Sequence, residues 1–479
     1  MASKHTLKQQ LGAFLLIVVF AVLGLPSTSA NELPDLGDRS DRAISPAMDA
    51  KHGRAFMQLL RQHLDIVEDD ELNEYIHDLG YRLVSESGSD KTFHFFVVND
   101  RAINAFAGPG GYIGIHTGLI FNSEYEDELA SVLAHEIAHV TQQHLARRFN
   151  KASNLNLATA AALIAAIVLG GEAGQAALLA TAAGAQQSFL NFSRAHEAEA
   201  DRIGMQVLQQ AGFDPRAMPA FFERLQQKMR FIDNSGTEFE FLRTHPVTTS
   251  RIADSRNRAN RYPPRPLQHQ NRFQLMKAKA RLISYPATRE SSAMLEQHTD
   301  DTSRYSYGLS LYQLKQYEEA ARVFQQLEQH KPLSSTYTIA LARALAHTSD
   351  NQKALPLLDQ ALALSPGNYS LLTAYSDILI QMERYQDAIP HLRQLQNHDL
   401  TTPKLFKQLA QTENQVGNAI ESHEAFAEYY YALGDLLTTM EHLKRALSFT
   451  DEQDIRRQRI NTRLNIVKEE HLELKEENP

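Results

Sequence analysis

The sequence predicts an α+β protein in which a mostly helical domain with a small sheet precedes an all-α superhelix. Apolar residues recur three and four positions apart through most of the chain, which is the spacing of amphipathic helices. Two short runs in the first half have the composition of strands, and small residues in the last third recur every 34 positions. We expect five segments: an export signal over 1–30, a domain that carries the chemistry over 31–256, a linker with connecting helices over 257–300, the repeats over 301–468 and a charged tail over 469–479.

The composition limits the kinds of site that the chain can build. It has 479 residues, a formal net charge of −9 and no cysteine. Without cysteine there are no disulfides, no thiolate metal ligands and no cysteine nucleophile, so a metal would need histidine or carboxylate ligands. Because the charge is mildly acidic and no long run of lysine and arginine occurs, nucleic-acid binding is not expected.

The first thirty residues have the order of a secretory signal. Lys4 and Lys8 precede an apolar run, Leu11–Leu25, and small residues then lead to Ala30. This order is typical of a signal peptide that is cut after Ala30. The apolar run has 15 residues, whereas a helix that spans a bilayer needs about 20. We therefore expect a periplasmic protein, with an uncleaved N-terminal anchor as the alternative.

Several further segments of the first half can be predicted. Residues 51–86 have helical spacing, and Phe93–Val98 and Gly111–His116 are strand-like runs joined through a Gly-Pro-Gly turn. Residues 152–187 are rich in alanine and broken by glycines, which favours two short helices as a lid or surface flap; contact with a membrane surface is the alternative. Residues 257–270 are polar and contain prolines, as a domain boundary does.

The last third has the period of tetratricopeptide (TPR) repeats. Each unit is a pair of helices, and small residues are required where the two helices touch. Terminal units are expected to depart from the pattern because they cap the stack, and the array should offer a groove to partner proteins; a simple spacer is the alternative. The positions that repeat at intervals of 34 are Gly308, Ala320, Phe324 and Pro332, then Ala342, Ala354, Leu358 and Pro366, then Ser376, Ala388 and Leu392, and finally Ala410, Ser422 and Phe426.

A helix is predicted from about Ser123 to Val140, and it carries the residue pattern of a metal site. Ser123 and Glu126 have the spacing of a capping box and should open this helix. Further along it lie His135, Glu136 and His139 in the order HExxH. Histidines four residues apart lie on one face of a helix, where both imidazoles can bind one metal ion. A glutamate beside them can act as general base toward a water molecule that the metal activates.

A hydrolytic zinc site needs a third protein ligand, for which three residues are candidates. His144 follows the HExxH motif by five residues without an intervening glycine, so we expect it to be an exposed helix residue. Glu197 lies on a second predicted helix with Asp201 one turn later, and Asp201 could accept a hydrogen bond from the outer nitrogen of a ligating histidine. His245 is the third candidate, with the shaping of its own His-Pro loop as the alternative role.

These motifs carry a family resemblance. The HExxH motif at His135–His139 followed by Glu197–Asp201 resembles the M48 metallopeptidases. The run Asn104–Ile113 and the later segment Thr244–Thr248 are similar to the same family. The resemblance extends over nearly the whole mature sequence.

The resemblance implies a zincin-type metalloprotease domain that holds one Zn²⁺ through His135, His139 and Glu197. It implies Glu136 as the catalytic base and Asp201 as a second catalytic residue, whose carboxylate accepts a hydrogen bond from a ligating histidine. In the family a histidine in the position of His245 is a regulatory fourth ligand that closes the resting site. The metal identity is an inference, because two histidines and a carboxylate also hold iron or manganese.

The resemblance also implies a function in the quality control of outer-membrane proteins. We expect an endopeptidase that degrades misfolded or stalled members of this class and assists their assembly, with its TPR domain contacting the barrel assembly machinery. An extended substrate could pair with the edge of the Gly111–His116 strand. The alternatives are a TPR chaperone or adaptor whose zinc site is latent or structural, and a protease held on a membrane surface through 152–187.

Overall fold

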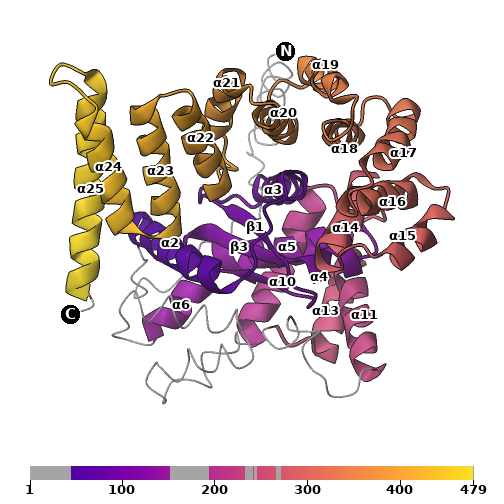
Figure 1. The fold of residues 1–479 in the computed structure, drawn as a ribbon. Coiled ribbons are helices and arrows are strands. Elements are labelled where there is room, and N and C mark those ends of the chain that lie inside the picture. The colour runs from indigo at the N-terminus through magenta and orange to yellow at the C-terminus, as the bar shows by residue number, and fades with distance from the viewer. Residues whose placement is uncertain (1–44, 152–193, 232–240, 242–244, 266–270, 478–479) are drawn as a thin grey trace, which may run out of the picture. The chain divides into compact units, whose positions relative to one another are not determined.

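The computed structural model describes residues 45–151, 194–231, 241, 245–265 and 271–477 (Figure 1). The predicted signal peptide and the alanine-rich segment 152–187 lie outside these residues. Among the helices that are described, none combines the length and the apolar character needed to cross a membrane.

The first part of the structure is mostly helical, as predicted. Its helices pack around a three-stranded sheet in two hydrophobic clusters, a larger one that contains Leu72 and Val132 and a smaller one that contains Phe56 and Phe106. In chain order the elements are α2 (Pro46–His63), α3 (Asp70–Val84), β1 (His94–Val98), β2 (Ala105–Ala107), η1 (Pro109–Gly111), β3 (Tyr112–His116), α4 (Thr117–Asn122), α5 (Glu126–Thr141), α6 (His144–Lys151), α10 (Arg194–Gln210), α11 (Ala217–Phe231) and α13 (Thr249–Ala259).

The sheet has the order β1-β3-β2, with β1 parallel and β2 antiparallel to β3. The two predicted strands are present as β1 and β3, whereas β2 is too short, at three residues, to give an alternating pattern. Because β3 is paired on both sides, the predicted pairing of a substrate with its edge is wrong. The edge strand that packs against α5 is β2.

The central helix α5 is buried along almost its entire length, from Glu126 to Val140. It begins at Glu126 with Tyr125 as N-cap, so the predicted capping box is wrong. Ser123 instead ends the preceding short helix, and its hydroxyl donates to the carbonyl oxygen of Leu119 at 2.8 Å. The sequence pattern could not separate the end of one helix from the start of the next because only three residues, 123–125, lie between them.

Helix α10 crosses α5 at very short range. Gly204 makes this approach possible, since a Cβ atom there would lie 2.9 Å from the carbonyl oxygen of Ala134. The close packing brings the first turn of α10 to the second half of α5, where the HExxH motif lies.

The second part of the structure is all-helical and contains the predicted repeats. Positions chosen by the 34-residue period are buried where paired helices meet: Ala320, Ala342, Ala354, Ser376, Ala388 and Ala410 have no exposed surface. Gly308 is required to be small, because a Cβ atom there would meet the ring of Phe324 at 2.5 Å. The prediction of a TPR array is therefore confirmed. Its helices, with two that precede it, are α14 (Asn271–Ser284), α15 (Arg289–Glu296), α16 (Asp301–Gln313), α17 (Tyr317–His330), α18 (Ser335–Leu345), α19 (Ala354–Leu364) after η2 (Asn351–Lys353), α20 (Tyr369–Gln381), α21 (Tyr385–Gln396), α22 (Pro403–Gln415), α23 (Ala419–Leu433), α24 (Leu436–Ser448) and α25 (Ile455–Glu477).

Helix α3 joins the two parts through its acidic side. The carboxylate of Glu74 accepts hydrogen bonds from the backbone N–H of Tyr369 at 3.1 Å and from the hydroxyl of Ser370 at 2.6 Å. Lys279 on α14 is buried between Asp69 and Glu71, at 3.1 and 2.5 Å. These contacts attach α14 and the start of α20, in the third helix pair of the array, to the region of α3.

Candidate metal centre

Two helices supply the first three residues of a buried polar group. On α5 the Nε2 atoms of His135 and His139 lie 3.0 Å apart, as expected for side chains one helical turn apart. From α10 the carboxylate of Glu197 reaches both rings, at 3.5 Å from Nε2 of His135 and 3.4 Å from Nε2 of His139. Each of the three side chains is at most 2% exposed.

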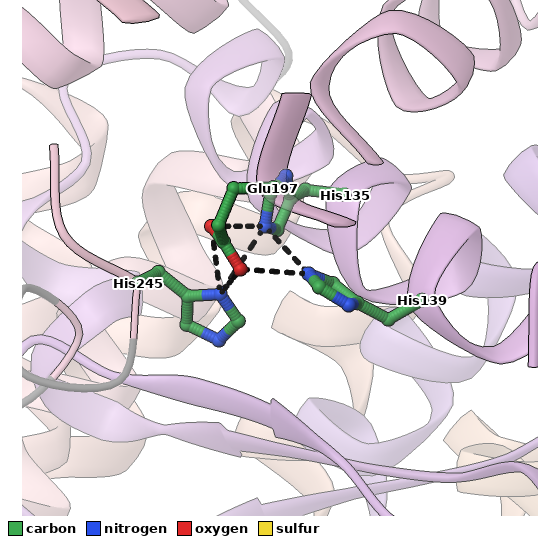
Figure 2. Close-up of side chains that lie close together, drawn as sticks. All are labelled: His135, His139, Glu197 and His245. Carbon is green, nitrogen blue, oxygen red and sulfur yellow. Dashed lines mark hydrogen bonds and ion pairs between the residues drawn. The ribbon is translucent and has the colours of Figure 1, made fainter. Parts of the chain in front are cut away.

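His245 completes the group from the segment that precedes α13. Its Nδ1 atom lies 3.3 Å from Nε2 of His135 and 3.0 Å from Oε1 of Glu197. Figure 2 shows the four side chains facing one another, with Nδ1 of His245 directed inward. One donor atom from each residue lies within 4.8 Å of all the others. The structure thus brings together all four residues that the sequence named as ligands.

Glu136 lies beside this group, where Oε1 is 3.5 Å from Nε2 of His245. It is fully buried, and neither carboxylate oxygen has a hydrogen-bond partner among the residues that the structure describes. Burial raises the pKa of this carboxyl. A fully buried carboxylate with a raised pKa beside the donor group fits a base that acts on a reacting molecule.

Asp201 and Arg251 support His135 from outside the four-residue group. Oδ1 of Asp201 lies 3.0 Å from Nδ1 of His135, which is the placement that the sequence predicted for it. Arg251 on α13 donates to both oxygens of Asp201 at 2.8 Å and lies 2.8 Å from Glu197. No sequence pattern pointed to Arg251, because only the packing of α13 against α10 brings it to the site.

The charges of the site favour a cation at its centre. Although burial opposes it, Asp201 and Glu197 raise the pKa of His135 to about 10. Burial also opposes ionisation of Glu197, but His245 and the two helix histidines outweigh it and hold the pKa of Glu197 well below its usual range. A positive charge at the centre is therefore stabilised, and three nitrogens with one carboxylate are a donor set that suits a divalent transition metal.

His144 is not the exposed helix residue that we predicted. Its side chain is completely buried, and Nδ1 lies 2.9 Å from Nδ1 of His139. The reason is a break after α5: Gln143 adopts a left-handed conformation with φ of 53°, so the chain turns back before α6 begins. His144 therefore lies outside the four-residue group but in contact with it. No sequence signal marked Gln143, which is not a glycine.

Comparisons with known proteins agree with this geometry. The model of peptidase family M48 matches residues 70–259, which contain all four residues of the group. The model of the tetratricopeptide repeat matches residues 345–412.

Relatives match over most of the chain. The beta-barrel assembly-enhancing protease of Escherichia coli K12 is 34% identical over 454 residues, covering 92% of this chain and 92% of that protein. The protein of the same name from Yersinia pestis is 39% identical over 313 residues, 63% of each chain. The mitochondrial metalloendopeptidase OMA1 of Schizosaccharomyces pombe is 34% identical over 184 residues, covering 37% of this chain and half of that protein. The chain therefore belongs to the metalloendopeptidases of family M48, in the group of the beta-barrel assembly-enhancing proteases.

Proposed function

We propose that this chain is a periplasmic, zinc-dependent endopeptidase that degrades misfolded or stalled outer-membrane proteins and assists the assembly of others. The observation that carries the proposal is the buried group of His135, His139, Glu197 and His245 with the buried carboxylate of Glu136 beside it. The name of the relatives supports β-barrel proteins as the substrate class. The predicted signal peptide supports the periplasmic location.

Zinc is the metal that we assign to the site. His135, His139 and Glu197 would hold it, since two imidazoles and a carboxylate are a common ligand set of catalytic zinc. When bound, zinc supplies Lewis-acid chemistry that activates a water molecule and polarises the scissile carbonyl.

The side chains around this position transfer the protons and orient the ligands. Glu136 takes the proton of the attacking water and delivers it to the leaving amine, first as general base and then as general acid. The raised pKa of Glu136 brings its affinity for a proton closer to what both steps require. Asp201 accepts from Nδ1–H of His135 and so fixes the ring that presents Nε2 to the metal.

We infer that His245 keeps the resting site closed. A hydrolytic zinc site needs a coordination position open to substrate, and His245 fills the fourth position of the donor group. The segment that carries it is tethered, because the N–H of His245 donates to the carbonyl of Phe241 at 2.7 Å and that of Phe241 donates to Ile103 at 3.1 Å. Arg251 also donates to the carbonyl oxygen of Pro246 at 3.0 Å. Opening therefore requires a substrate or partner that breaks these bonds.

An extended substrate would pair with β2. This strand (Ala105–Ala107) is at the sheet edge and packs against α5, which carries the catalytic residues. Strand addition uses backbone hydrogen bonds and so accepts many sequences. Acceptance of many sequences suits an enzyme whose substrates are outer-membrane β-barrel proteins that have not completed folding.

The remaining roles are assigned to the array. We propose that the TPR domain, over 301–468, presents unfolded outer-membrane proteins or contacts the barrel assembly machinery, since TPR surfaces bind proteins. The bounds 31–256 of the protease domain rest on the sequence alone, as does the role of 152–187 as a lid or surface flap, with peripheral membrane contact as its alternative.

Degradation of an unfolded outer-membrane β-barrel protein by the purified mature chain tests the proposal. We expect slow cleavage by the parent, faster cleavage by His245→Ala and none by Glu136→Gln, because glutamine keeps the shape of glutamate but cannot take a proton. A chelator should abolish cleavage, and added zinc should restore it.

The chaperone alternative predicts another pattern. If Glu136→Gln matches the parent in both substrate turnover and assembly, the proteolytic function is rejected and the chain acts as an adaptor with a latent site.

A further inference from the structure

A chain of three side chains leads outward from His139, away from the donor group. Nδ1 of His139 lies 2.9 Å from Nδ1 of His144, and Nε2 of His144 lies 3.0 Å from Oε2 of Glu199. Arg147 on α6 donates to the same oxygen at 3.2 Å. The ring of His144 also stacks on that of His196, with centroids 4.5 Å apart and planes at 14°.

The direction of these hydrogen bonds follows from the chemistry of their two ends. Glu199 is ionised beside Arg147 and can only accept, so Nε2 of His144 carries a hydrogen atom. A His139 ring that offers its Nε2 to a metal ion carries its hydrogen on Nδ1, and Nδ1 of His144, 2.9 Å away, accepts that hydrogen. Nδ1 of His139 must therefore be the donor, and Nε2 of His139 is left with the lone pair.

That lone pair is the one that faces the donor group. Nε2 of His139 lies 3.0 Å from Nε2 of His135 and 3.4 Å from Glu197. The tautomer that the chain from Glu199 selects is thus the one in which His139 can bind a metal ion. On His135 the corresponding contact is direct, since Oδ1 of Asp201 lies 3.0 Å from Nδ1.

We propose that His144 is a positioning residue of the metal site, and that with Glu199 it fixes the ring and tautomer of His139. The inference rests on the proposed metal site and adds two residues to it. Carboxylate partners of metal-binding histidines are common, and here a second imidazole extends the reach of the carboxylate by one ring. The left-handed turn at Gln143 serves this placement, because it returns the chain so that His144 meets the residue five positions before it.

Zinc affinity of the full-length mature protein, measured by competition with a chromophoric chelator, tests the proposal. We expect His144→Leu, which fills the volume without hydrogen bonds, to weaken zinc binding by about 10- to 100-fold. Glu199→Ala should weaken it in the same direction. His144→Gln should recover most of the affinity, because its carbonyl can accept from His139 and its amide can donate to Glu199.

A control variant separates loss of folding stability from loss of metal positioning. His116 is also a buried histidine, 3% exposed, but it lies at the end of β3 and its contacts are with Asp100 and Phe106. We expect His116→Leu to leave zinc affinity unchanged.

The zinc-affinity measurements distinguish a failure of this inference from a failure of the proposed function. If the parent itself binds no zinc, the proposed metal site is rejected. If the parent binds zinc and His144→Leu binds it equally well, only the positioning role is rejected. Equal weakening by His144→Leu and His144→Gln would also overturn it, since packing rather than hydrogen bonding would then be responsible.

Discussion

At the scale of single residues, Arg251 holds the carboxylates of the site in place. It donates to both oxygens of Asp201, lies 2.8 Å from Glu197 and also binds the carbonyl of Pro246. Its guanidinium also lies 5.1 Å from the ring centre of Phe222. The cation is 7% exposed, so its charge is needed to compensate two buried acids.

Replacement of Arg251 should therefore destabilise the metal-free protein. We expect Arg251→Met to lower the free energy of unfolding by about 3–5 kcal/mol, because the buried carboxylates of Asp201 and Glu197 then lose the guanidinium that contacts both. Urea unfolding of the metal-free protein measures the change. Arg251→Lys should be intermediate, since lysine keeps the charge but cannot bind both oxygens of Asp201 in one plane. An unfolding midpoint for Arg251→Met equal to that of the parent would contradict this role.

At the scale of elements, the site depends on how closely two helices approach. His135 and His139 belong to α5 and Glu197 to α10, so their separation is set by the distance between the helix axes. Gly204 lies about two turns after the ligand Glu197 on α10, against the backbone of Ala134 and His135. A side chain at this position would contact backbone, which cannot move aside as a flexible side chain can.

Gly204→Ala should therefore impair the site although alanine favours helices. We expect a loss of about 1–3 kcal/mol in the free energy of unfolding from overpacking, together with weaker zinc binding. Gly367→Ala is a matched control, because a Cβ atom there would have no neighbour within 4 Å. Chelator competition measures the zinc affinity of both variants, and urea unfolding measures their stability. A zinc affinity of Gly204→Ala equal to that of the parent would show that the helix spacing tolerates a methyl group.

At the scale of the whole molecule, the protease and the first helices of the array share one core. The hydrophobic cluster that contains Leu72 and Val132 continues through Tyr305, Phe324 and Tyr337. Later repeats have a separate cluster, with Leu392 among its buried members. The first repeat pair therefore belongs energetically to the catalytic part of the chain.

Two truncations of buried side chains should separate these clusters. We expect Phe324→Ala and Leu392→Ala each to lower the free energy of unfolding of its own cluster by about 2–5 kcal/mol. Only Phe324→Ala should lower the urea concentration at which peptidase activity is lost, because only Phe324 shares the core of the active site. Equal effects of the two variants on the activity midpoint would mean that the molecule unfolds as a single unit.

The sequence alone determined the features that are encoded within one element or one repeat. The spacing of His135 and His139 places them on one face because a helix has a fixed number of residues per turn. The period of 34 placed Ala320, Ala354 and Ala388 at buried helix contacts. It could do so because each repeat is the same pair of helices, so equivalent positions have equivalent neighbours. Glu197 and His245 were named from a family resemblance, and the structure brings them to the two histidines.

The tertiary structure decided which distant elements meet. Arg251 and Asp201 are 50 residues apart, and no local pattern relates them. His144 is buried because one left-handed residue, Gln143, redirects the chain, and β3 is central because the three-residue β2 pairs with it. Each of these outcomes depends on packing free energy summed over many contacts between elements, whereas periodicity reports only on contacts within an element.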